Sequence, residues 1–87
     1  MITVKLHKDF EKQLAKLPTK RRELVISVLD KFVDDQFHTQ LRNHTLTGEW
    51  AGFRSISAGG DLRLHFEMID SDTAFFVAVG THSQLYK

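Results

Sequence analysis

The stretch that decides the fold is "LRLHFEMIDSDTAFFVAV", Leu62 to Val79. Its first half alternates in polarity, which predicts a strand with one buried face. The buried face would carry Leu62, Leu64, Phe66 and Met68, and the opposite face Arg63, His65 and Glu67. "DSDT" has the composition of a turn, and "AFFVAV" is apolar on both faces. We therefore expect an antiparallel hairpin whose second strand is central in its sheet.

Two more strands are predicted on the N-terminal side of this hairpin. "FRSIS", Phe53 to Ser57, precedes the turn "AGGD", and "ITVKL", Ile2 to Leu6, alternates enough to be the first strand. Both runs are short and rich in β-branched and aromatic residues, as strands usually are.

Two amphipathic helices are predicted between those strands. Phe10, Leu14 and Leu17 share one helical face before Pro18, and a second apolar stripe runs from Lys20 to about Asp35. A connection of only two residues makes a helical hairpin. The expected fold is α+β, in the order β-α-α-β-β-β, with the hairpin packed on one face of a mostly antiparallel four-stranded sheet. The other sheet face would stay partly open.

Composition limits the function classes. Eighty-seven residues predict a single domain, 1–87, and the absence of cysteine excludes disulfides, thiolate metal sites and a cysteine nucleophile. We expect a cytoplasmic protein with no membrane association, since no run reaches the roughly 18 apolar residues of a spanning helix. A net charge of +1 is compatible with a nucleic-acid partner but does not by itself indicate one.

Strand direction brings two residues with useful chemistry together. In an antiparallel hairpin the start of the first strand lies beside the end of the second, so Arg63 and His82 should be neighbours. A cation beside a histidine suits phosphodiester cleavage. The pattern alone favours a plainer interpretation, in which His82 caps the sheet edge, His44 is a surface loop residue, and His65 belongs to a solvated sheet face. No His, Cys, Asp or Glu spacing is typical of zinc, so no metal or cofactor is expected.

Two segments resemble a known family. "NHTLTGEWAGFRSISAGGDLRLHFE" and "VAVGTHSQLY" are similar to the YafQ-like branch of the RelE/ParE superfamily of bacterial toxins. That branch tends to show H-P-L-x-G, a G-x-R strand, an aspartate before the next strand, and G-T-H-x-x-L-[FY]. The resemblance implies a RelE-like fold and a metal-independent endoribonuclease, an mRNA interferase. Such toxins usually cut mRNA on the ribosome and are neutralised by a cognate antitoxin.

The resemblance also assigns site residues. His44, Asp61 and His82 match the family positions, Tyr86 stands for the terminal aromatic residue, and Arg63 matches an arginine of the RelE and YoeB branches. Ser57 stands where YafQ-like toxins carry another histidine, and Thr45 replaces the proline of H-P-L.

These positions imply a mechanism. His82 would act as general acid and His44 as general base, with the two roles exchangeable, because histidine titrates near neutral pH. Arg63 would clamp the scissile phosphate. Arg54 would assist it, Asp61 would orient a histidine or arginine, and Tyr86 would stack on a base or contact the phosphate. Ser57 is expected among the substrate-binding residues as well.

Two alternatives stay open. One is a ParE-like toxin that inhibits gyrase; the other is a decayed module that mainly binds its antitoxin. The retained histidines argue against the first, and Ser57 keeps the second open. Operator DNA would be contacted only through the antitoxin complex.

Overall fold

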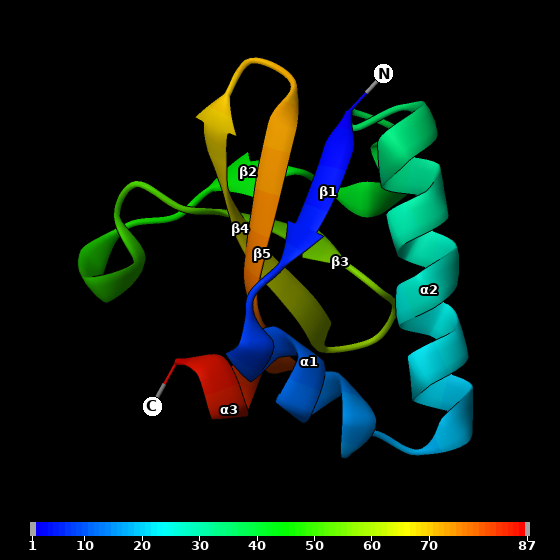
Figure 1. Ribbon diagram of the computed structural model, residues 1–87. Coiled ribbons are helices and arrows are strands. Elements are labelled where there is room, and N and C mark those ends of the chain that lie inside the picture. The colour runs from blue at the N-terminus through cyan, green and yellow to red at the C-terminus, as the bar shows by residue number, and fades with distance from the viewer. Residues whose placement is uncertain (1, 87) are drawn as a thin grey trace.

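The structure, a computed structural model, describes residues 2–86 and contains a five-stranded sheet. The strand order is β1-β5-β4-β3-β2, and the strands are β1 (Thr3–Leu6), β2 (His44–Thr45), β3 (Arg54–Ser57), β4 (Leu62–Asp70) and β5 (Thr73–Thr81). β1 runs parallel to β5, and every other neighbouring pair is antiparallel. The α+β class and the central position of the apolar strand are confirmed (Figure 1).

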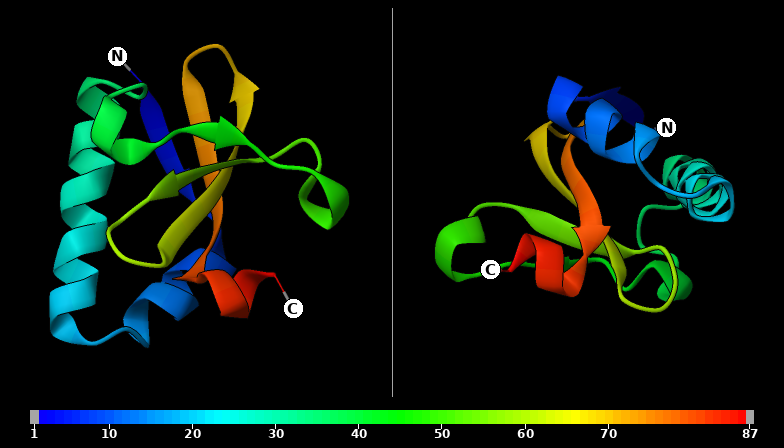
Figure 2. Two further views of the ribbon diagram at one scale, coloured as in Figure 1. Left: turned by 180° about the vertical axis from the view of Figure 1, so that it is seen from behind. Right: turned by 90° about the horizontal axis from the view of Figure 1, so that it is seen from below.

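Two helices precede the long connection, as the apolar stripes predicted. They are α1 (Lys8–Ala15) and α2 (Thr19–Asp34). α1 lies at one end of the sheet, while α2 runs along one side of it; the connection between β2 and β3 lies on the other side (Figures 1 and 2). None of the helices within residues 2–86 is long and apolar enough to cross a bilayer.

The expected count of four strands was wrong. Segments outside the predicted strands and helices contain the short strand β2, the 3-10 turns η1 (Thr39–Leu41) and η2 (Gly48–Trp50), and the C-terminal helix α3 (His82–Leu85). β2 forms because two residues of the connection pair with β3. α3 forms because Thr81 and Gln84 cap each other: Thr81 N donates to Gln84 Oε1 over 2.8 Å, and Gln84 N donates to Thr81 Oγ1 over 3.2 Å.

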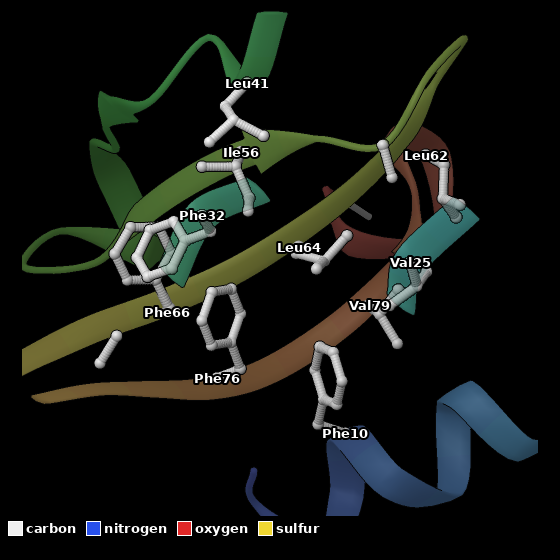
Figure 3. Packing of buried hydrophobic residues seen from close by; sticks show 12 residues of the cluster. Phe10, Val25, Phe32, Leu41, Ile56, Leu62, Leu64, Phe66, Phe76 and Val79 are labelled. Atoms are coloured by element: carbon white, nitrogen blue, oxygen red, sulfur yellow. The ribbon is translucent and has the colours of Figure 1, made fainter. Parts of the chain in front are cut away.

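The core joins the helices to the central strands through phenylalanines. Phe32 of α2 lies 5.0 Å from Phe66 and 5.2 Å from Phe76, measured between ring centroids, and those two rings stack at 4.8 Å (Figure 3). Phe10 of α1 meets Phe76 edge-on at 5.8 Å. Each aromatic pair contributes about 0.5–1.5 kcal/mol beyond the burial of its surface. This packing makes β4 and β5 a rigid mount for side chains on the opposite face.

Candidate active site

Three of the five histidines gather on the open face of the sheet, the face turned away from α2. The other two have local structural roles. Nδ1 of His7 accepts a hydrogen bond from Asp9 N at the start of α1, and Nδ1 of His38 accepts one from Gln40 N at η1. His44, His65 and His82 are therefore the histidines available for chemistry on the sheet.

His44 and His65 lie in one row across three strands. His44 of β2 is paired with Ser55 of β3, and Ser55 is in turn paired with His65 of β4. Directly opposed residues of antiparallel strands project from the same face. The register therefore places His44, which was predicted to be catalytic, on the same face and in the same row as His65, which was predicted to be a solvated surface residue.

The hydrogen bond of His44 fixes which of its nitrogens can accept a proton. Nδ1 lies 2.7 Å from the carbonyl oxygen of Arg42. A carbonyl oxygen only accepts, so Nδ1 carries the hydrogen, and the free lone pair of the neutral ring is on Nε2. The His44 side chain is exposed, which leaves Nε2 accessible to a substrate.

Arg63 is held beside the β3–β4 turn. It lies opposite Ser57 on one side and Gly80 on the other. Its Nη1 donates to Ser57 Oγ at 3.3 Å and to the carbonyl oxygens of Gly60 and Leu62 at 2.9 and 3.1 Å. These contacts use one end of the guanidinium, which leaves Nη2 and Nε as donors for an anion. Gly80 is two residues before His82, in agreement with the predicted proximity of Arg63 to the chain around His82.

α3 presents His82 and Tyr86 at the end of β5. The backbone N–H of His82 donates to Asp61 O over 2.9 Å, so these two predicted site residues are brought together. The imidazole of His82 packs against the Tyr86 ring, with centroids 4.3 Å apart and planes at 30°. The side chains of His82 and Asp61 are exposed.

His65 is the residue that sequence reasoning missed. It was predicted to lie on a solvated face, but its side chain is fully buried. Trp50 from η2 covers it at 4.4 Å between ring centroids, and Tyr86 covers it at 5.3 Å. The correction has a clear physical reason: the face of the strand was predicted correctly, but both covering rings come from segments distant in the chain.

Burial, together with the positive charges of His44 and His82, lowers the pKa of His65 from 6.5 to about 4, and burial is the largest of these causes. The imidazole of His65 is therefore neutral at neutral pH. Because the charges of His44 and His82 act on the pKa of His65, the three histidines share one electrostatic environment.

Arg54 is not brought together with the other predicted residues. It is paired with Phe66, so its side chain leaves the sheet on the face that carries the core. Its Nε donates to Asn43 Oδ1 over 2.7 Å, and its guanidinium lies over the ring of Phe37. Arg54 therefore lies apart from the other predicted site residues.

No group of three or more His, Cys, Asp or Glu side chains within residues 2–86 is arranged to hold a metal ion. The open face carries imidazole, guanidinium, phenol and carboxylate groups.

Comparisons with solved structures define the class of protein. YafQ from E. coli strain BL21(DE3) has a TM-score of 0.79 at 18% identity, with all of both chains covered. YafQ in an E. coli DinJ–YafQ complex has a TM-score of 0.77 at 20% identity over the whole of both chains. A metal-bound toxin from Helicobacter pylori has a TM-score of 0.74 at 27% identity, covering 99% of this chain and 100% of its own. The fold is that of the YafQ-like toxins.

The sequence family is equally clear. The model of the family described as "Bacterial toxin of type II toxin-antitoxin system, YafQ" matches residues 2–87. No curated protein gives a match. The chain belongs to the YafQ family of toxins of type II toxin–antitoxin systems.

Proposed function

We propose that this toxin is a metal-independent endoribonuclease that cleaves mRNA, on the ribosome in the bacterial cytoplasm, and is neutralised by a cognate antitoxin. The observation that carries the proposal is the grouping of His44, His82 and Arg63 on one sheet face, with Nε2 of His44 free to accept a proton. The DinJ–YafQ complexes support a protein partner of the antitoxin kind.

The geometry favours His44 as the general base. Its Nε2 takes the proton of the ribose 2′-OH, and the 2′-oxygen attacks phosphorus to form a 2′,3′-cyclic phosphate. His82 in its protonated form gives a proton to the departing 5′-oxygen. Arg63 stabilises the charge on the phosphorane, and the carbonyl oxygen of Asp61 holds the backbone N–H of His82.

An open face suits a polymer substrate better than a closed pocket does. The RNA backbone lies across the sheet between β2 and α3, and Tyr86 offers its ring to a base. The attack by the 2′-OH makes the enzyme specific for RNA over DNA.

Cleavage of translated mRNA tests this function directly. Purified protein is added to ribosomes translating a defined message, and primer extension maps new 5′ ends. The matched control is the His44→Ala protein, which should give none. Inhibition of gyrase supercoiling without mRNA cleavage would replace the proposal with the ParE-like alternative. Tight antitoxin binding with neither activity would identify a decayed toxin.

A further inference from the structure

His65 is a buried titratable group that the mechanism above does not use. Within residues 2–86 the buried polar side chains are those of Ser55 and His65, and both are fully buried. Burying a polar group costs free energy unless hydrogen bonds compensate for it. His65 lies in the same row across the sheet as His44, and the burial of its imidazole needs a physical explanation.

The hydrogen-bond partner of His65 belongs to the segment that carries His82. Nε2 of His65 lies 3.2 Å from the Tyr86 hydroxyl. Tyr86 follows α3 directly, and its ring is the one against which His82 packs. A continuous line of contacts therefore runs from the centre of the sheet through Tyr86 to His82.

α3 depends on such contacts because it has only four residues, too few for a helix to be stable alone. One tie is Trp50, whose Nε1 donates to Leu85 O over 3.0 Å while its ring covers His65. The other tie is the bond between Tyr86 and His65. Together they hold α3 over the open face.

The surroundings of His65 keep its imidazole neutral. His44 and His82 face it from β2 and α3, and their positive charges and its burial oppose its protonation, while Arg63 and Glu67, of opposite charge, flank it on its own strand. A neutral imidazole has one N–H and one lone pair, so Nε2 can pair with a phenol in either tautomer.

We propose that His65 is a positioning residue for His82: by binding the Tyr86 hydroxyl it fixes the tyrosine ring, and the ring fixes the imidazole of His82 above the scissile phosphate. An exposed histidine otherwise samples several rotamers, and proton transfer needs a precise placement. The part of this inference that concerns catalysis rests on the proposed ribonuclease function.

A double-mutant cycle tests the coupling. His65→Leu keeps the buried volume apolar, and Tyr86→Phe removes only the hydroxyl. Each single variant should lower kcat roughly tenfold, which corresponds to the loss of one hydrogen bond. The double variant should be no slower than either single variant. His65→Gln, which can still bind the phenol, should recover part of the rate. Glu67→Gln, on the same face, is the control and should keep the wild-type rate.

The position of His82 is measured separately from activity. In ¹H–¹³C NMR spectra the ring current of Tyr86 shifts the Hε1 resonance of His82, and both single variants should move that resonance towards its position in an unstructured peptide. Additive losses of kcat, or an unmoved His82 resonance in His65→Leu, would overturn the proposal.

These measurements separate this inference from the proposed function. If wild-type protein does not cleave RNA but the His82 resonance moves in both variants, the positioning stands and the ribonuclease assignment falls. If His65→Leu does not fold, as judged by circular dichroism, Tyr86→Phe alone decides the matter, because it changes an exposed residue.

Discussion

The backbone N–H of His82 donates to the carbonyl oxygen of Asp61 over 2.9 Å, which joins the start of α3 to the start of β4. This bond fixes the Cα of His82 but involves neither side chain. Substitutions of the two side chains therefore leave the backbone bond in place and report on chemistry.

His82→Ala should abolish cleavage without unfolding the protein. Loss of a general acid or base typically lowers the rate roughly 10²–10⁴-fold. The His82 side chain is exposed, so the thermal midpoint should change little. Primer extension on translated mRNA and a circular dichroism melt measure the two effects. Full toxicity of a folded His82→Ala protein would show that the terminal "GTHSQLY" is structural.

Ser57→His should raise the cleavage rate. Ser57 lies opposite Arg63, and its hydroxyl accepts from Nη1 of that arginine at 3.3 Å. A histidine there adds a titratable group beside the phosphate-binding cation, and the gain should be at least tenfold if it supplies acid–base catalysis. Ser57→Gln is the matched control, similar in length but unable to titrate. An equal change in both variants would mean that size, not protonation, alters the rate.

The stability of the fold should fall as the pH is lowered from about 6.5 to about 4. The pKa of His65 is about 4 in the folded protein and 6.5 as its ordinary value, so in this window the unfolded chain binds more protons. The contribution of His65 is fully present above the unfolded pKa and lost as the pH falls. The shift of pKa corresponds to about 3 kcal/mol.

Urea titrations of wild type and His65→Leu at several pH values measure this effect. The difference between the two unfolding free energies should change by up to about 3 kcal/mol between pH 7 and pH 4, because carboxylates common to both proteins cancel. A constant difference across that range would contradict the burial of a neutral His65.

The sequence predicted the central hairpin correctly because the alternation along Leu62–Met68 indicates which side chains face the hydrophobic core. It did not predict α3, although Thr81 and Gln84 have the spacing of a capping box, a local signal that was present in the sequence. The burial of His65 had no local signal. It depends on Trp50 and Tyr86, which come from the connection before β3 and from the C-terminal end. Likewise, only the register of β2 with β3 places His44 beside Ser55.

Positive side chains along α1 and at the start of α2 form a basic row that we expect to attract an acidic antitoxin. Lys8, Lys12 and Lys20 of this row are exposed. The guanidinium of Arg22 is held against the connection between α1 and α2, since its Nη1 donates to Leu17 O over 2.8 Å. Lys16 lines a depression with Gln84 and Leu85, so that end of the row lies next to α3.

Reversing the charge of Lys8 and Lys12 together should slow association with the cognate antitoxin by roughly tenfold at low salt, because steering between opposite charges acts on the association rate. RNA cleavage should keep its wild-type rate. Lys5→Glu with Lys31→Glu is the matched control, with the same change in net charge at positions outside α1. Stopped-flow measurements at several salt concentrations give the rates. Equal slowing of both double variants would mean that net charge alone causes the effect. Unchanged association in both would place the antitoxin contacts over the open sheet face.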